Sequence, residues 1–344
     1  MASDSRIKSL HISFAQDPTL VPGISPYHAD WPGWIDALIG YEESTLVPFP
    51  TGGTVIEMPD TPLKIALAGD WGAQTDAARV VGQIIAEEAC DYSIHLGDVY
   101  TTGDHFEHGI FAEQWPAGKL GSFCLDGNHD LYSSGAGYLE TLANPKFTAQ
   151  GGQPYFALRN RSWLIVGLDS ARASTSVLYQ EGLFDSIQMA WLADLIRNKG
   201  DRQVILLSHH DAFNPACLDS TESRRSTAIV YKPILSQILK LGITGYWYWA
   251  HVHCPVVYAP SQGLKCRCIG HGGVPYLPFP GAPAVYGDDV VKLLWAEQEP
   301  IAGLDRAAAG FAMLFLDGPN LREQFIDEFG RSVWSSDFYV GPQH

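Results

Sequence analysis

Residues 64–100 read KIALAGDWGAQTDAARVVGQIIAEEACDYSIHLGDVY and contain three successive secondary-structure patterns. An apolar run at 64–71 ends in an acidic turn, and residues 78–89 repeat apolar side chains with the period of an amphipathic helix. A second apolar run follows at 91–100 and again ends at an aspartate. A strand, a helix and a strand in this order predict a layered α/β architecture.

The same alternation continues toward the C-terminus. Further strands are predicted at 121–130, 151–160, 161–170, 203–213 and 246–253, and helices at 188–198 and 229–243. From residue 311 the pattern predicts antiparallel strands with turns at Asp317-Gly318 and Phe329-Gly330. Residues 1–61 mix proline, glycine and aromatic residues with weak periodicity. We therefore expect 1–61 to be an extension that wraps a single domain at 62–344.

Composition limits the possible partners. The 344 residues are 46% hydrophobic, enough for one large core. There are 22 basic and 38 acidic residues, for a net charge of −16, which argues against a nucleic-acid polymer or an anionic membrane as partner. A small phosphorylated substrate would then need local positive charge, which bound metal cations can supply. The oligomeric state is left open.

Segments that direct a chain to a membrane or out of the cell have recognisable patterns. No stretch reaches the roughly 18 consecutive apolar residues of a membrane span, and the start MASDSRIKSLHISFAQ has no secretory pattern. The six cysteines lie in mostly apolar contexts and are expected to be buried free thiols. We therefore expect a cytoplasmic protein.

Side chains able to bind metals stand at the ends of five predicted strands. In an open α/β sheet, the loops beyond the carboxyl ends of the strands converge on one crevice. Each of these residues alone would be an ordinary turn or core residue, but five strand ends rarely collect carboxylate, amide and imidazole groups by chance. The residues are Asp70, Asp98, Asn128 with His129 and Asp130, His209 with His210, and His251 with His253.

The blocks GDWG, GDVY, GNHD, LLSHH and AHVH, in this order, resemble the calcineurin-like metallophosphoesterase superfamily. Within it the chain looks most like the purple acid phosphatase branch, which also has aspartate, any residue, glycine in the first block. The resemblance runs from about Lys64 to the C-terminus. It implies a four-layer α/β/β/α sandwich of two mixed sheets with a dinuclear metal centre.

The resemblance also implies roles for single residues. Asp70 and His253 would hold the first metal, and Asp98 would bridge both metals. The second metal would be held by Asn128, His209 and His251. A metal-bound hydroxide would attack phosphorus in line, because paired cations lower the pKa of bound water. His129 would stabilise charge or protonate the leaving oxygen, and Asp130 would orient the His129 ring.

The chain departs from the branch at the first metal. Purple acid phosphatases have a tyrosine three positions after the bridging aspartate, where this chain has Thr101, and Tyr100 comes one residue early. On a strand, a one-residue shift turns a side chain to the opposite face. Gly72 also leaves no histidine in the first block. Gln74, Tyr100 and His105 are candidates to fill the open position.

Three metal contents follow from this departure: two divalent ions (Mn, Fe or Zn), an iron centre with Tyr100 as ligand, or a single occupied site. His210 and His271 are candidates to contact substrate. The function that we expect is hydrolysis of phosphate esters. A cyclic-nucleotide or nucleotide phosphodiesterase and a non-catalytic metal-binding scaffold are the alternatives. His129 and Asp130 argue against the scaffold, since neither is needed merely to hold metal.

Overall fold

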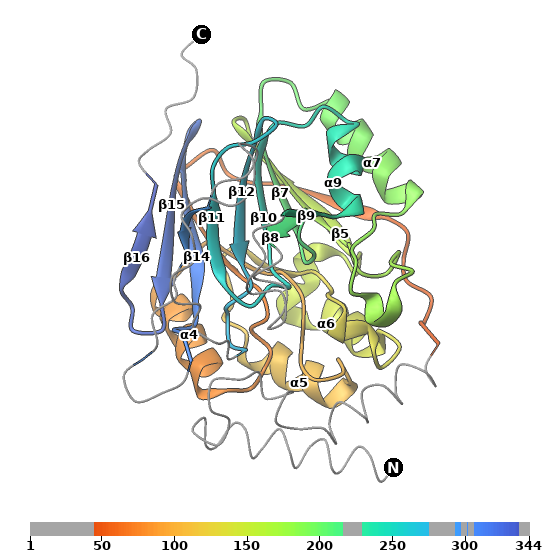
Figure 1. The fold of residues 1–344 in the computed structure, drawn as a ribbon, viewed down its shortest axis with the longest axis vertical. Helices are drawn as coiled ribbons and strands as arrows, with labels where there is room; N and C mark the ends of the chain where they lie inside the picture. The colour runs from red at the N-terminus through yellow and green to blue at the C-terminus, as the bar shows by residue number, and fades with distance from the viewer. Residues whose placement is uncertain (1–44, 216–228, 275–292, 297–300, 302–305, 337–344) are drawn as a thin grey trace.

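Short apolar strands from both halves of the chain form two large sheets (Figure 1). The computed structural model describes residues 45–215, 229–274, 293–296, 301 and 306–336. In the eight-stranded sheet the spatial order is β1 (Gly53–Glu57), β5 (Tyr155–Arg159), β6 (Trp163–Leu168), β7 (Gln203–Ser208), β10 (Gly245–Trp249), β12 (Leu264–Ile269), β11 (Pro255–Tyr258) and β13 (Leu293–Ala296). In the six-stranded sheet it is β16 (Ser332–Ser335), β15 (Asn320–Asp327), β14 (Gly310–Asp317), β2 (Leu63–Ala68), β3 (Tyr92–His95) and β4 (Gly121–Cys124).

Both sheets are mixed. The strands β2, β3 and β4 pair in parallel, and β14 joins β2 in antiparallel register. In the larger sheet β6, β7, β10 and β12 are parallel, whereas β5 and β11 run against their neighbours β6 and β12. A separate pair is formed by β8 (Phe213–Pro215) and β9 (Ile229–Tyr231).

Helices cover the outer face of each sheet (Figure 1). The six-stranded sheet packs against α4 (Asp76–Glu87), α5 (His105–Gln114) and α6 (Ala136–Ala143). The eight-stranded sheet packs against α7 (Ser186–Arg197) and α9 (Pro233–Leu239). Short 3-10 helices are η2 (His129–Leu131), η3 (Pro145–Gln150) and η4 (Val177–Tyr179).

Three hydrophobic clusters fill the spaces between four layers. Ile65 and Leu67 of β2 lie in the cluster between the sheets, whereas Ala66 and Ala68 face the helices. Because successive strand residues point to opposite faces, a strand buried on both sides must be apolar throughout. The expected α/β/β/α sandwich of two mixed sheets is therefore confirmed.

The predicted helix at 229–243 is wrong at its start. Residues 229–231 form β9, and α9 begins only at Pro233. Proline disfavours helical backbone in the residue before it and suits the first helical position, so the helix cannot extend back through Lys232.

The antiparallel tail is confirmed. Strands β14 and β15 pair from Gly310↔Asp327 to Asp317↔Asn320, and β16 pairs with β15. Gly318 and Gly330 have φ of +53° and +72°, a backbone that glycine adopts without penalty at these turns.

Two other expectations concern the ends of the chain and its thiols. Strand β1 lies inside the segment 1–61, and the boundary between an extension and the domain stays a prediction. Five cysteines are buried free thiols as expected, and Cys217 lies outside the described residues. In the described part of the chain, no helix has the length and apolar character needed to cross a bilayer. A cytoplasmic location stays a prediction.

Candidate metal centre

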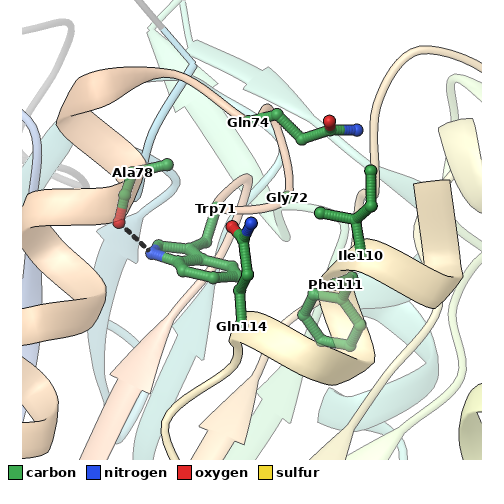
Figure 2. A pocket seen from close by; sticks show the side chains of 7 residues that line it. All are labelled: Trp71, Gly72, Gln74, Ala78, Ile110, Phe111 and Gln114. Carbon is green, nitrogen blue, oxygen red and sulfur yellow. Dashed lines mark hydrogen bonds between the residues drawn. The ribbon is translucent and has the colours of Figure 1, made fainter. Parts of the chain in front are cut away.

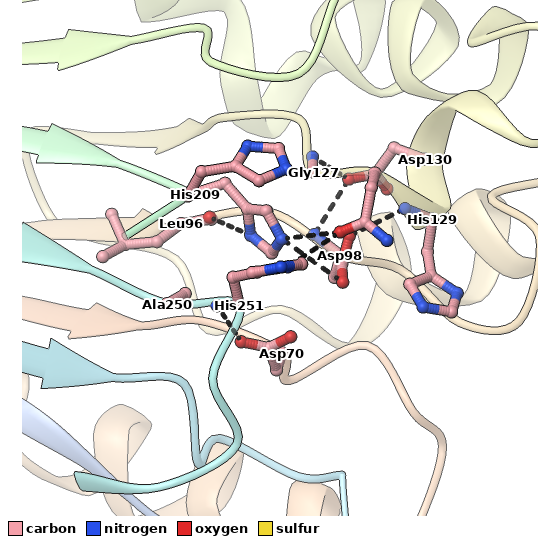
Figure 3. A network of polar contacts seen from close by, with 12 residues as sticks. Asp70, Leu96, Asp98, Gly127, His129, Asp130, His209, Ala250 and His251 are labelled. Carbon is pink, nitrogen blue, oxygen red and sulfur yellow. Dashed lines mark hydrogen bonds and ion pairs between the residues drawn. The ribbon is translucent and has the colours of Figure 1, made fainter. Parts of the chain in front are cut away.

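The five polar blocks meet at one edge of the two sheets, beyond the ends of β2, β3, β4, β7 and β10 (Figure 3). Three of the residues, Asp70, Asp98 and His251, have positive φ values of 55°, 71° and 62°. Left-handed backbone is uncommon in residues other than glycine, and such strain clusters at functional sites. The strand ends are therefore bent so that these side chains turn inward.

Acceptor atoms converge around His209. Its Nδ1 lies 2.9 Å from the carbonyl oxygen of Leu96, an atom that can only accept, so Nδ1 carries a hydrogen. The opposite atom, Nε2, lies 3.1 Å from Asn128 Oδ1 and 3.4 Å from Asp98 Oδ2. Asn128 Oδ1 is also 3.0 Å from His251 Nδ1. A carboxylate, an amide oxygen and imidazole nitrogens facing one point fit a cation between them.

The pKa values of His209 and Asp98 also indicate that this position favours a positive charge. Burial lowers the pKa of His209, but the Asp98 carboxylate outweighs burial and raises that pKa to about 9. Burial opposes ionisation of Asp98, yet His209 holds the pKa of Asp98 well below its usual range. A positive charge is therefore favoured here, and either a proton or a metal ion can supply it.

The hydroxyl of Tyr100 lies at the centre of the other ligand group. It is 2.5 Å from Asp70 Oδ1, 2.9 Å from Asp98 Oδ2 and 2.8 Å from His253 Nε2. His253 Nε2 is in turn 3.2 Å from Asp70 Oδ1. These atoms surround the position expected for the first metal.

The one-residue shift would turn Tyr100 away only if strand geometry continued past Asp98, and it does not. Strand β3 ends at His95, well before Tyr100. Gly97 and Asp98 then have φ of +98° and +71°, so the two-residue period of a strand no longer applies. The bent backbone directs Tyr100 to the site.

His129 lies beside the cluster, against two aromatic rings. Its ring centroid is 4.3 Å from that of Tyr100 and 4.7 Å from that of Tyr132. His129 Nδ1 lies 2.7 Å from the carbonyl oxygen of Thr101, and its backbone N–H donates to Asp98 Oδ1. The backbone carbonyl of Thr101 therefore fixes the imidazole.

We expect from the sequence that Asp130 orients the His129 ring, but in the structure its carboxylate bonds other groups. Its Oδ2 accepts hydrogen bonds from the backbone of Asp98 at 2.9 Å and of Gly127 at 2.6 Å. Its Oδ1 accepts from the backbone of Val99 at 3.0 Å and lies 3.0 Å from His108 Nε2. The carboxylate ties the loops after β3 and β4 together, which leaves no oxygen for the His129 ring (Figure 3).

Of four further candidates, three lie elsewhere, and His210 lies beside the second position, where a ring nitrogen lies within 4.8 Å of ligand atoms of His209 and His251. Gln74 lines a small hollow with Trp71, Gly72, Ala78, Ile110, Phe111 and Gln114 (Figure 2). His105 is exposed and pairs with Glu140 at 2.8 Å. His210 is buried, with Nδ1 2.9 Å from Ser170 Oγ and Nε2 2.8 Å from the Tyr179 carbonyl, so both ring nitrogens are engaged within the protein. His271 is only 3% exposed and lies against Gly310, not at a rim.

Two supporting residues were missed from the sequence. Buried Glu107 accepts hydrogen bonds from the backbone of Thr101, Thr102 and Asp104, and so holds the loop that carries Tyr100 and Thr101. Asp104 and Glu107 form a capping box at the start of α5, and the spacing D-x-x-E is its sequence signature. Tyr132, four residues after Asn128, accepts a hydrogen bond from the Asn128 amide at 2.7 Å.

Comparison with known proteins identifies the class. The family model of calcineurin-like phosphoesterases matches residues 63–255, more than half of the 344 residues. The chain belongs to this family. No curated protein sequence matches the chain.

Solved structures share the fold at low sequence identity. A purple acid phosphatase, PPD1, from yellow lupin (Lupinus luteus) seeds matches with a TM-score of 0.57 and 12% identity, over 84% of this chain and 54% of the lupin chain. This chain thus spans about half the length of the lupin enzyme. GAP50, the anchor in the inner membrane complex of Plasmodium, matches with a TM-score of 0.53 and 11% identity, over 82% of this chain and 90% of its own. A dimetal phosphatase from Danio rerio matches with a TM-score of 0.50 and 11% identity, over 77% of this chain and 96% of its own.

Proposed function

We propose that this chain is a dinuclear metal-dependent hydrolase of phosphate esters, with His129 assisting. One observation carries the proposal: acceptor atoms from five strand ends converge on two adjacent positions, and a fixed imidazole lies beside them. The fold alone would not be enough, because one fold hosts many functions. An anchor and two phosphatases are among the proteins of similar fold.

The ligands divide into two groups around Asp98. Asp70, His253 and the Tyr100 hydroxyl face the first position, and Asn128, His209 and His251 face the second. Asp98 lies within reach of both groups and would bridge them. Two bound cations would lower the pKa of a water molecule and clamp the phosphoryl oxygens of the substrate.

The contacts of Tyr100 favour one of the metal alternatives. A phenolate so placed supplies the fourth protein ligand that Asp70, Asp98 and His253 lack. We therefore propose iron at the first position, with Tyr100 as ligand, and a divalent Mn, Fe or Zn ion at the second.

His129 is the residue of the chain that moves a proton. Because its Nδ1 donates to the Thr101 carbonyl, Nε2 is the ring atom that would protonate the leaving oxygen. In the described residues, no lysine or arginine contacts the six proposed aspartate, asparagine and histidine ligands. Bound metals would supply positive charge for a phosphate group.

Hydrolysis of aryl phosphates tests the proposal. We expect turnover of an aryl phosphate monoester or diester with added Mn²⁺, and a loss of about 10²- to 10⁴-fold in His129→Ala. His105→Ala, which removes an exposed histidine outside the site, is the matched control and should keep wild-type turnover. Wild-type turnover no greater than that of His129→Ala would favour the non-catalytic scaffold. A preference for diesters would favour the phosphodiesterase alternative.

Metal analysis and a visible spectrum of the purified protein test the iron assignment. A tyrosinate charge-transfer band with at least one equivalent of iron, lost in Tyr100→Phe, is the expected result. A colourless protein that holds only divalent Mn, Zn or Fe would assign Tyr100 a structural role instead.

A further inference from the structure

The amide of Asn128 can serve as a ligand in only one of its two orientations. A primary amide has an oxygen on one side and an NH₂ group on the other, and the two have nearly the same shape. Asn128 Oδ1 faces His209 Nε2 and His251 Nδ1 at 3.1 and 3.0 Å. If the amide turned over, its NH₂ group would face the second metal position and repel a cation.

The side chain of Tyr132 lies on the other side of that amide. Its hydroxyl is 2.7 Å from Asn128 Nδ2, and the residue is fully buried. Asn128 and Tyr132 flank the short helix η2, so they lie four residues apart on adjacent turns. The ring of Tyr132 also packs against the His129 ring.

A second amide makes the Tyr132 oxygen an acceptor. Gln180 Nε2, from the residue after η4, donates to the same hydroxyl at 3.2 Å. A phenol oxygen that accepts from both Asn128 and Gln180 uses its lone pairs on these two donors, and its own hydrogen must point elsewhere. In this arrangement the NH₂ side of Asn128 faces Tyr132, and turning the amide over would require the hydroxyl to rotate and donate to Asn128 Oδ1 instead.

We propose that Tyr132 is a positioning residue that selects the metal-binding orientation of Asn128, with Gln180 supporting it. This inference rests on the proposed function, because it assigns Asn128 to the second metal. Removing an outer partner of a metal ligand typically weakens metal affinity about 10- to 100-fold. The effect should fall on the second metal more than on the first, because the Tyr132 hydroxyl bonds the amide of Asn128, which we assign to the second metal.

Calorimetric titration of metal-free protein with Mn²⁺ tests the inference. In Tyr132→Phe the ring is kept and the hydroxyl is lost, so we expect one of the two Mn²⁺ affinities to fall about 10- to 100-fold, with the other within threefold of wild type. Tyr155→Phe is the matched control, since Tyr155 is equally buried and donates one hydrogen bond to the Thr51 carbonyl at 2.7 Å. Both Mn²⁺ affinities of this control should stay within threefold of wild type.

A carboxylate at position 128 gives a sharper test. Asn128→Asp has oxygen on both sides, so the orientation no longer matters. In that background Tyr132→Phe should change second-site affinity less than threefold, whereas with Asn128 present the change should be at least tenfold. Gln180→Ala should weaken the second site in the same direction by a smaller factor.

The outcomes separate the inference from the proposed function. Unchanged second-site affinity in Tyr132→Phe, or an equal fall at both sites, would overturn the positioning role while the wild type still binds two ions and hydrolyses phosphate esters. A wild type with no second Mn²⁺ site would overturn the dinuclear function itself, and the positioning role with it.

Discussion

Replacing Asp130 by asparagine separates a structural role from a catalytic one. The Asp130 carboxylate accepts hydrogen bonds from the backbone of Asp98, Val99 and Gly127 at 2.9, 3.0 and 2.6 Å, and the residue is 1% exposed. In Asp130→Asn one acceptor oxygen becomes an NH₂ donor that faces at least one of these N–H groups. Its geometry is otherwise nearly unchanged.

The expected loss can be worked out from these contacts. A buried N–H left without an acceptor costs about 1–3 kcal/mol. Each remaining hydrogen bond to a charged acceptor becomes a neutral one, which weakens it by about 1 kcal/mol. The free energy of unfolding of Asp130→Asn should therefore fall by about 3–5 kcal/mol. Equilibrium unfolding in urea measures this loss, with Asp76→Asn, a partly exposed carboxylate at the start of α4, as the control.

Comparison with His129→Ala gives the refuting result. His129→Ala should lose turnover, and it also removes the hydrogen bond to Thr101 and the ring packing against Tyr100 and Tyr132. The main effect of Asp130→Asn should be a lower free energy of unfolding. If Asp130→Asn kept its unfolding free energy within about 1 kcal/mol and lost turnover as His129→Ala does, Asp130 would act on the imidazole and our assignment would be wrong.

Three further predictions concern stability. Arg267→Met should lower the free energy of unfolding in urea by about 3–5 kcal/mol, because it leaves Glu323 without its cation. Glu323 is 1% exposed and bonded to Arg267 at 2.7 and 3.0 Å. The double variant Arg267→Met, Glu323→Gln should regain part of the lost stability, and equal losses in the single and double variants would contradict this prediction. Burial lowers the pKa of His271 to about 3, below the ~6.5 of an unfolded chain, so the neutral ring stabilises the fold above pH 6.5 and this stability is lost as pH falls toward 3. Between pH 8 and 5.5 the loss from this histidine is about 1.4 kcal/mol, and the pH dependence of urea unfolding should be smaller by that amount in His271→Leu; identical pH dependence in the two proteins would refute it. Chelation should lower the melting temperature, and Mn²⁺ at 100 times its Kd should restore about 2.7 kcal/mol of stability; a melting temperature unaffected by both would argue against a metal centre.

The fold was predictable because its signals are local. Apolar runs with a two-residue or 3.6-residue period give the layers, and Ile65, Ala66 and Leu67 alternate between two cores as a strand must. The edge at which the polar blocks meet was also predictable, because the carboxyl ends of neighbouring strands lie together. Asp70 and His253 are far apart in sequence, yet their side chains are 3.2 Å apart.

The direction in which individual side chains point could not be predicted in the same way. Beyond a strand end the direction of a side chain depends on loop dihedral angles, and Asp98 at φ +71° has no signature in a single sequence. That backbone brings Tyr100 to His253, and it leaves Asp130 on backbone N–H groups instead of the His129 ring. His210 and His271 have the right residue type at the right strand ends, but packing encloses both of them.

The sequence by itself therefore determined the layers, the edge where the site lies and the residue types gathered there, because hydrophobic periodicity and strand ends are properties of neighbouring residues. Only the tertiary structure decided which of those residues face the metal positions and which hold the loops. Each contact of that kind joins segments remote in sequence, as Gln180 and Tyr132 do beside Asn128, and depends on how the loops pack.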